Sequence, residues 1–265
     1  MIRKYYGFNN YKIRKETGKS IIERKSKIYY LYEIVDIDAV IKQYEISINL
    51  KNYYKFVPNI YNSIISEYKN HYYVLLEYTN NILEIKNIFF EKKKIPSWKS
   101  LWIKKSDYIQ DYYKKIKGKY KLIDESFDYY IGLLELAIYY LKDYGNYFDK
   151  LYIEHEIVDE ENYYNPLNIK LDIKERDFAE YLKFLFYSSQ YKKSNLHKLL
   201  LEFKNTYDYN LVISRLIYPS YYFNLFDDII LGKKEEELKS VICRNKEYEE
   251  YINQILVEIK NINLG

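Results

Sequence analysis

Cysteine, proline and glycine are all scarce in this chain of 265 residues, which contains one Cys, four Pro and seven Gly. The single thiol, Cys243, excludes a disulfide framework and any zinc or iron–sulfur site built from several cysteines. Its neighbours follow a helical pattern, so we expect a half-buried structural thiol. The longest apolar run, residues 131–141, is too short for a membrane span and contains Glu135. Because the basic start has no apolar run behind it, we expect no signal peptide, and the sequence predicts a soluble intracellular protein.

An excess of one charge sign is also missing. Lys and Arg number 42 against 38 Asp and Glu, a formal net charge of +4 that indicates no particular partner. Apolar residues make up 48% and charged residues 30%, which is typical of a folded domain. Tyrosine, by contrast, is abundant, with 37 residues. Because Tyr, Lys, Ile and Asn share A/T-rich codons, we interpret this mainly as coding bias and expect many tyrosines to be partly buried at core edges. Adhesion or cross-linking is the alternative.

Two hydrophobic periodicities divide the chain. Runs of β-branched and aromatic residues predict three strands within residues 11–35, a helix over 36–52 and two strands over 59–68 and 71–79. From residue 80 onward, apolar residues recur at three- and four-residue spacing, which predicts helices. These are expected at 126–141, 177–187, 195–203, 211–225 and, as one long amphipathic helix, 234–261. The sequence thus predicts an α+β protein with a small strand-rich lobe at 1–79 and a larger helical lobe at 80–265.

This order of elements, together with several short strings, carries a resemblance to a known family. The strings are residues 125–139 (ESFDYYIGLLELAIY), 164–168 (YNPLN), 176–181 (RDFAEY) and 214–223 (SRLIYPSYYF). They resemble the bacterial spore-coat kinase-like family (CotS/YutH type) of the aminoglycoside phosphotransferase and protein-kinase-like superfamily. The resemblance implies a two-lobed protein-kinase-like fold. It also implies a protein of the mother-cell cytoplasm that is assembled into the spore coat, with other coat or scaffold proteins as partners.

The first half of the chain lacks parts that phosphoryl transfer needs. A kinase-like site uses a glycine-rich loop over the phosphates and a Lys on the third strand that pairs with a helical Glu. Only Gly7 and Gly18 are available for that loop, without a G-x-G-x-x-G pattern, and Gly18 is typical of an ordinary hairpin turn. The third strand contains no Lys beyond Lys27, which opens it and is expected to face solvent. Without a partner Lys, Glu45 is expected to be an exposed helical residue.

The catalytic-loop pattern of the superfamily, H-x-D-x4-N, is met only in part. Two residues after His155 comes Ile157, where the catalytic Asp belongs, whereas Asn162 falls seven residues after His155. The base position is therefore apolar. Asp159 could replace the base only if the loop were rebuilt.

The metal-binding and supporting positions are similarly degenerate. Asp172 could correspond to the metal-binding Asp, but it lies only five residues before Asp177, in a shortened segment. The resemblance gives Arg176 and Asp177 a structural role in supporting the loop, and this role survives loss of catalysis. We therefore predict no catalytic, cofactor or metal site, and we expect the protein not to bind Mg-ATP productively.

Two charge clusters remain. The acidic residues of segment 154–161 could bind a divalent cation, although such loops are usually just solvated. Segment 91–121 contains eleven Lys against three acidic residues, a net charge of +8, and it includes Trp98 and Trp102. The tryptophan spacing predicts core positions and the lysines a solvated face. An acidic partner is the alternative. Nucleic acid is disfavoured because such a charge run is more often a solvated face, and nucleic-acid binding predicts Lys99, Lys104, Lys114 and Lys117 on one continuous exposed face.

Three functions stay open at this point. The favoured one is a non-catalytic spore-coat component, a pseudokinase that binds other coat proteins. The second is an active ATP-dependent phosphotransferase on a small molecule or coat protein, using Asn162 and Asp172 with a rebuilt base. The third is a binder of nucleic acid or another polyanion through the basic segment.

Overall fold

The computed structural model describes residues 1–192 and 195–264. Its contacts divide the chain into two compact units. The first consists of Met1–Glu84 and His155–Lys170, and the second of Ile85–Glu154 and the chain from Leu171 onward. The first unit thus includes residues 155–170, whereas we predicted one uninterrupted N-terminal lobe over residues 1–79. That return of the chain is a long-range contact, which no local pattern of residues indicates.

The first unit is built on a six-stranded antiparallel sheet with the order β1-β2-β3-β6-β4, in which β5 also pairs with β6. Three strands, a helix and two strands were predicted, and all are present, with α1 and the two-residue β4 in addition. The elements are α1 (Ile2–Tyr6), β1 (Lys12–Glu16), β2 (Lys19–Arg24), β3 (Lys27–Ile34), α2 (Ile37–Ser47), β4 (Lys55–Phe56), β5 (Ile65–Tyr68) and β6 (His71–Glu77).

The two faces of this sheet are covered by different segments. Because side chains alternate along a strand, β3 and β6 bury residues on both faces. Leu31 and Leu75 contribute to a cluster that includes Phe8, whereas Ile34 contributes to a second cluster with Val40 of α2. Helix α2 begins where the Asp36 side chain accepts a hydrogen bond from the Ala39 backbone N–H at 2.9 Å, a normal N-cap.

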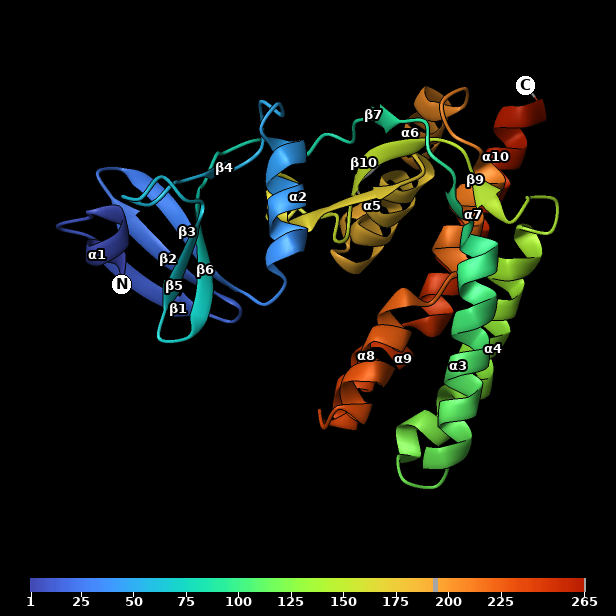
Figure 1. Ribbon diagram of the computed structural model, residues 1–265. Helices are drawn as coiled ribbons and strands as arrows, with labels where there is room; N and C mark the ends of the chain where they lie inside the picture. Colours follow the sequence, from blue (N-terminus) through green and yellow to red (C-terminus); the bar gives the residue numbers. More distant parts are fainter. Residues whose placement is uncertain (193–194, 265) are drawn as a thin grey trace. The chain divides into compact units, whose positions relative to one another are not determined.

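The second unit is mainly helical, as the spacing from residue 80 onward predicted. Figure 1 shows α3 and α4 as a long antiparallel pair. Between them, the two units contain the remaining elements: β7 (Ile88–Glu91), β8 (Ile95–Pro96), α3 (Trp98–Ile116), α4 (Lys121–Tyr140), β9 (Tyr147–Phe148), β10 (Leu151–His155), the 3-10 helix η1 (Pro166–Asn168), β11 (Ile169–Asp172), α5 (Glu175–Tyr187), η2 (Gln190–Lys192), α6 (Leu196–Phe203), α7 (Tyr209–Ile217), α8 (Ser220–Ile230), η3 (Glu235–Leu238), α9 (Lys239–Ile242) and α10 (Asn245–Leu264).

Helix α4 supplies the centre of the large core. Phe127, Leu134 and Ala137 are buried there, in a cluster that extends through α5, α7, α8 and α10. The same cluster contains Trp98 and Trp102, which are 2% and 4% exposed and stack with ring centres 5.5 Å apart. The prediction that these tryptophans are core residues is confirmed.

The prediction of one long helix over residues 234–261 was wrong. That segment forms η3, α9 and α10, with a break at residues 243–244. At the break the Arg244 guanidinium donates hydrogen bonds to the backbone oxygens of Phe186 and Tyr187, both at 3.2 Å, and so satisfies carbonyls at the end of α5. Cys243 caps α9 and is exposed, which corrects the prediction of a half-buried thiol.

The tyrosines are distributed as we predicted. Most are buried or half-buried, and many of the half-buried ones lie against the large core. The exposed ones are Tyr11, Tyr61, Tyr108, Tyr139, Tyr147 and Tyr221, which come from both units. Within the described ranges, no helix has both the length and the hydrophobicity that crossing a membrane requires.

Candidate functional site

The segment that resembles a catalytic loop follows β10, which ends at His155. His155 is only 1% exposed, and its ring Nε2 lies 2.7 Å from the Tyr53 hydroxyl. The ring stacks on Tyr53, with centres 5.7 Å apart, and lies 4.2 Å from the ring centre of Tyr163. His155 is thus enclosed by aromatic side chains.

Asn168 closes the loop by binding the residue at the base position. Its Oδ1 accepts a hydrogen bond from the Ile157 backbone N–H at 2.9 Å, and its Nδ2 donates to the Ile157 carbonyl at 2.6 Å and to the Asn162 carbonyl at 3.0 Å. The Asn168 carbonyl also accepts from the Glu156 N–H at 2.9 Å. Sequence reasoning gave Asn168 no role. The available signal was its place in the Pro166–Asn168 turn, just before the next strand.

Asn162 has a different partner from the one that a metal-binding role would require. Its Nδ2 donates to both carboxylate oxygens of Asp159, at 3.0 and 2.8 Å. Asp159 Oδ1 also accepts from the backbone N–H groups of Glu161 and Asn162, at 2.9 and 2.7 Å. This is the pattern of an Asx turn, so Asp159 organises the loop backbone. The structure therefore brings Asn168, and not Asn162, into contact with Ile157.

The strand that should provide a lysine presents Tyr32 instead. The Tyr32 hydroxyl accepts a hydrogen bond from Asn165 Nδ2 at 3.1 Å. Directly opposite Tyr32 on β2 lies Lys19, whose side chain is 11% exposed and forms an ion pair with Glu161. Lys19 Nζ also lies 4.4 Å from the centre of the Tyr30 ring, a cation–π contact. Burial lowers the pKa of Lys19. We missed this lysine because strand pairing, not sequence proximity, places it beside β3.

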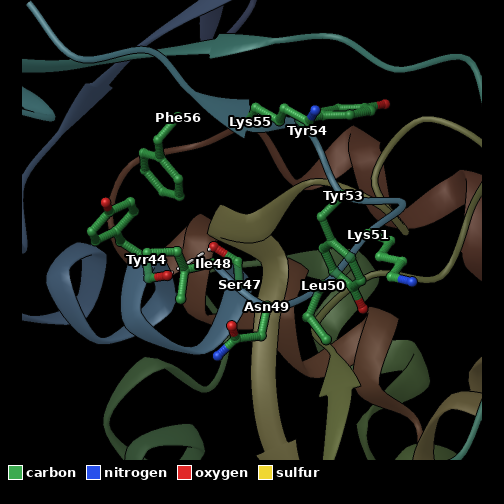
Figure 2. A pocket seen from close by; sticks show the side chains of 10 residues that line it. All are labelled: Tyr44, Ser47, Ile48, Asn49, Leu50, Lys51, Tyr53, Tyr54, Lys55 and Phe56. Atoms are coloured by element: carbon green, nitrogen blue, oxygen red, sulfur yellow. Dashed lines mark hydrogen bonds between the residues drawn. The ribbon is translucent and has the colours of Figure 1, made fainter.

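Three further aromatic rings fill the same face of β3. Tyr30 lies 5.8 Å from Tyr54 and 5.5 Å from Tyr78, and Tyr54 lies 5.1 Å from Tyr78, measured between ring centres. The Tyr54 hydroxyl donates to the Glu161 carbonyl at 2.6 Å, which ties this cluster to the loop. Tyr54 also lines a hollow of about 440 Å³ that extends to Tyr44 and Ser47 in the last turn of α2 (Figure 2).

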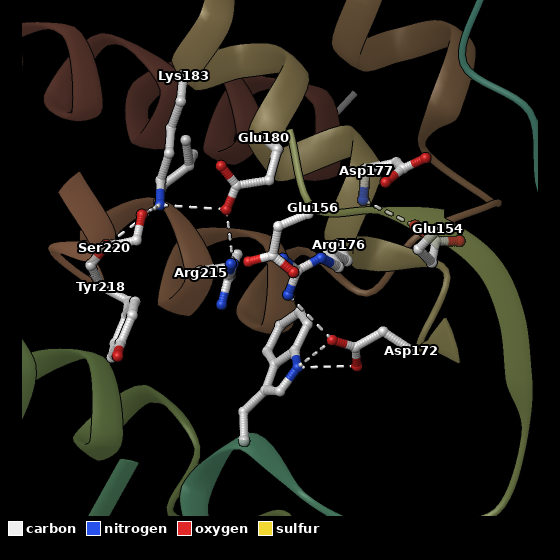
Figure 3. Close-up of polar contacts among 12 residues, drawn as sticks. Glu154, Glu156, Asp172, Arg176, Asp177, Glu180, Lys183, Arg215, Tyr218 and Ser220 are labelled. Atoms are coloured by element: carbon white, nitrogen blue, oxygen red, sulfur yellow. Dashed lines mark hydrogen bonds and ion pairs between the residues drawn. The ribbon is translucent and has the colours of Figure 1, made fainter. Parts of the chain in front are cut away.

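In the second unit, the Asp172 carboxylate is bound by two neighbouring side chains. Trp98 Nε1 donates to both of its oxygens, at 2.9 and 3.1 Å, and Arg176 Nη1 lies 3.2 Å from its Oδ2 (Figure 3). Its Oδ1 accepts from the Ile173 N–H as well. The side chain is 10% exposed. Asp172 thus neutralises a buried arginine and joins α3 to the start of α5.

Asp177 and Glu154 meet at the end of β10. The Asp177 backbone N–H donates to Glu154 Oε2 at 2.8 Å, and Glu154 is fully buried. Its Oε1 is buried without a hydrogen-bond partner among the described residues. Burial, reinforced by the nearby Asp177 charge, raises the pKa of Glu154 well above its ordinary value. The contact links α5 to the strand that precedes the loop, and loop support by Arg176 and Asp177 stays a prediction.

A second buried ion network binds α5 to α7. Glu180 Oε1 lies 2.7 Å from Arg215 Nε and 3.4 Å from Lys183 Nζ (Figure 3). Lys183 also donates to the Tyr218 carbonyl and the Ser220 hydroxyl, both at 3.1 Å. Burial alone would raise the Glu180 pKa, but the two cations outweigh burial and hold that pKa at about 2.

The acidic run at residues 154–161 does not converge on one point. Glu156 pairs with Lys170 at 2.6 Å, Glu161 with Lys19, and Asp159 binds the loop backbone. Among the residues that the structure describes, no three His, Cys, Asp or Glu side chains cluster closely enough to hold a metal ion.

The lysines of α3 do not form one continuous face. Lys99 is half-buried and donates to the Lys142 carbonyl at 3.0 Å, whereas Lys104 is exposed. At 3.6 residues per turn these two side chains point about 140° apart. Lys105 and Lys114 are paired with Asp227 and Asp111. The single lysine face that nucleic-acid binding would need is therefore not present on α3.

Comparison with solved structures defines the class of the fold. An aminoglycoside phosphotransferase from Alicyclobacillus acidocaldarius aligns over 96% of this chain and 93% of its own, with a TM-score of 0.62 at 10% identity. The AMP-bound spectinomycin phosphotransferase APH(9)-Ia aligns over 96% and 92%, with a TM-score of 0.55 at 10% identity. The chain therefore has the α+β kinase-like fold of these phosphotransferases, with a strand-rich N-terminal part and a helical C-terminal part, as predicted.

The family follows from the sequence. The family described as "Spore coat putative kinase YutH" matches residues 83–255, and the chain belongs to that family. The endospore coat-associated protein YutH of Bacillus subtilis (strain 168) is 26% identical over 190 residues, which cover 60% of this chain and 56% of the relative. The match thus spans little more than half of that relative. The resemblance to the spore-coat kinase-like family is confirmed.

Proposed function

We propose that this protein is a non-catalytic kinase-like component of the spore coat. The observation that carries the proposal is the contact between Asn168 and Ile157. The loop backbone is bound at both Ile157 polar groups, yet the side chain at the base position is apolar and 50% exposed. An aliphatic side chain can neither accept the proton of an attacking hydroxyl nor orient it.

The charged groups that could compensate are engaged elsewhere. Lys19 is the cation beside β3, and it is paired with Glu161 and packed on Tyr30. Asp172 is bound to Trp98 and Arg176. Phosphoryl transfer depends on positioned charge around the phosphates, and internal ion pairs would have to break before either group could serve.

The coat assignment rests on relatives. The B. subtilis protein is named as endospore coat-associated, and we extend that association to this chain. We infer that the protein acts in the mother-cell cytoplasm, assembles into the coat and binds other coat proteins. An acidic partner could bind to segment 91–121. Within that segment, the turn between α3 and α4 is the best binding surface, because Lys117 and Lys119 are exposed there.

An active phosphotransferase is the second candidate, and the fold of the solved relatives favours it. Thermal unfolding of the full chain with ATP, with and without Mg²⁺, separates the two. A ligand that binds only the folded state raises the melting temperature. We expect no magnesium-dependent rise in melting temperature and no phosphate release from ATP.

A magnesium-dependent rise that Lys19→Met abolishes and Lys15→Met preserves would establish a nucleotide site, and phosphate release would establish an enzyme. Lys15 is the matched control because it is an exposed lysine on the neighbouring strand.

A further inference from the structure

A shallow hollow of about 550 Å³ lies at the β2–β3 turn of the first unit. Four of the residues that line it are basic: Lys12 at the start of β1, Arg24 at the end of β2, Lys25 in the turn and Lys27 at the start of β3. The one acidic residue in the lining is Glu23. Neither the loop at residues 155–170 nor the aromatic cluster around Tyr30 contributes to this hollow.

Arg24 packs on a buried aromatic ring. Its guanidinium carbon lies 4.3 Å from the centre of the Phe8 ring. Phe8 is 5% exposed and packs on Tyr29, with ring centres 5.0 Å apart. A guanidinium stacked on an immobile ring loses less conformational freedom when it binds an anion than a free side chain does.

One donor group of the Arg24 guanidinium lacks a hydrogen-bond partner among the described residues. This group, Nε, is buried. No described carboxylate forms an ion pair with Arg24, Lys12 or Lys25, whereas Lys27 is paired with Glu77 at 2.7 Å. Arg24 as a whole residue is half-buried, so solvent still reaches part of its side chain. Lys12, Arg24 and Lys25 contribute three positive charges and Glu23 one negative charge. The lining of the hollow therefore carries an excess of two positive charges.

The turn fixes the remaining part of the hollow. Lys25 and Ser26 have φ angles of 45° and 62°, so two successive non-glycine residues adopt the left-handed conformation of a tight hairpin turn. Backbone hydrogen bonding between β2 and β3 continues to the register pair Arg24 and Lys27, which flanks this turn. The turn therefore has a defined shape.

We propose that this hollow binds a phosphate group, with Arg24 as the hydrogen-bonding anchor and Lys12 and Lys25 as the supporting charges. A phosphate monoester carries a charge of about −1.5 to −2 at neutral pH, which matches the excess of two positive charges better than a single carboxylate does. The planar guanidinium binds two phosphate oxygens at once, and lysines add point charge. The phosphate can come from a phosphorylated side chain of a partner or from a free oligophosphate.

Calorimetric titration of the full chain at low ionic strength tests the site. The probes are inorganic tripolyphosphate, a five-residue glycine peptide with a central phosphoserine, and the same peptide with unmodified serine. We expect Arg24→Gln to weaken phosphate binding by at least about tenfold, because a charge-assisted bidentate contact is lost. Arg14→Gln is the matched control: it removes the same charge from the neighbouring strand, where Arg14 is exposed and already paired with Glu16. It should change the affinity by less than about twofold.

Each outcome decides the proposal. Binding of the phosphopeptide but not of its serine parent supports a phosphorylated partner as the source, and binding of tripolyphosphate alone supports a free oligophosphate. The proposal is overturned if neither phosphate probe binds, or if the two arginine variants weaken binding equally. If Arg24→Gln fails to fold, the double variant of the exposed lysines, Lys12→Gln with Lys25→Gln, replaces it and should weaken binding at least about fivefold.

Discussion

The Asn168 side chain binds both backbone polar groups of Ile157. Asn168 Oδ1 lies 2.9 Å from the Ile157 nitrogen, and Asn168 Nδ2 lies 2.6 Å from the Ile157 carbonyl oxygen. These bonds do not involve the Ile157 side chain. The loop can therefore keep its conformation whether residue 157 is acidic or apolar. This separates the two properties of a catalytic loop, since its shape depends on Asn168 and its chemistry on residue 157.

Replacing Asn168 should destabilise the protein more than replacing Asn162. Asn168→Ala leaves the Ile157 N–H and C=O without their partner, and because these contacts are only partly buried, we expect a loss of about 1–2 kcal/mol, in the lower part of the range for unpaired buried groups. Asn162→Ala removes contacts to Asp159 only, in a half-buried turn, and should cost less than about 1 kcal/mol. Urea unfolding of both variants measures the difference. Equal losses would show that Asn168 is not the residue that closes the loop.

Asp172 should behave as a structural residue. Asp172→Asn removes the charge that neutralises Arg176, which is 3% exposed, and breaking a buried pair costs about 3–5 kcal/mol. Trp98→Phe keeps the ion pair but removes the indole N–H together with part of a buried ring, so its loss comes from packing and one hydrogen bond and not from an unpaired Arg176 charge. Both are measured by thermal unfolding. If Mg²⁺ raised the melting temperature of the wild type but not of Asp172→Asn, the carboxylate would be a metal ligand and our interpretation of Asp172 would be wrong.

Sequence reasoning succeeded where one periodicity extends over a whole element. The aromatic and β-branched run at residues 27–34 predicted β3, and the three- and four-residue spacing after residue 126 predicted the core face of α4. Trp98 and Trp102 followed from the same spacing. In these segments the local pattern and the tertiary burial agree, so the pattern is sufficient.

The site was harder to predict because its contacts join distant residues. Lys19 and Glu161 are 142 positions apart, and only strand pairing and the return of residues 155–170 bring them together. Asn168 resembled any turn asparagine until its bonds to Ile157 were visible. The long helix predicted at the C-terminus is broken for a similar reason, since Arg244 binds carbonyls of α5 that are remote in sequence.

The Glu180 network should make the protein sensitive to acid. The Glu180 pKa is lowered from 4.5 to about 2, so the folded state holds the carboxylate ionised. The resulting stabilisation, about 3 kcal/mol, is fully present above pH 4.5 and is lost as the pH falls towards 2. Glu180→Gln should therefore be much less stable than the wild type at pH 7, and the difference should shrink on acidification. Urea titrations at several pH values test this, and a difference that does not depend on pH would contradict it.

Glu154 should have the opposite pH signature. Its pKa is raised by burial, so the folded state favours the neutral acid. The contribution is fully present below the ordinary glutamate pKa of 4.5 and is lost as the pH rises through the folded value. Glu154→Gln, a neutral isostere, should thus gain stability relative to the wild type as the pH rises. Glu156→Gln is the exposed control and should show little pH dependence. A Glu154→Gln variant that loses relative stability at high pH would show that Glu154 is ionised in the fold.

Lys19 should contribute more to stability than its charge pair alone suggests. The Glu161 side chain is 52% exposed, and an ion pair with so exposed a partner contributes about 1 kcal/mol at most. Lys19 itself is 11% exposed and also lies over Tyr30, where a largely desolvated cation–π contact adds about 1–2 kcal/mol. Lys19→Met should therefore cost about 2 kcal/mol, and Glu161→Gln less than about 1.

Salt dependence distinguishes the two contacts of Lys19. Screening weakens exposed ion pairs, so high salt should reduce the effect of Glu161→Gln while leaving most of the effect of Lys19→Met. Near-ultraviolet circular dichroism of Lys19→Met should also change, because the Tyr30 ring loses its contact, whereas Lys15→Met, on the exposed neighbouring strand, should leave the spectrum unchanged. If Lys15→Met destabilised the protein as much as Lys19→Met, the lysine would act through general charge, and the link that we describe between β2, Tyr30 and the loop would not exist.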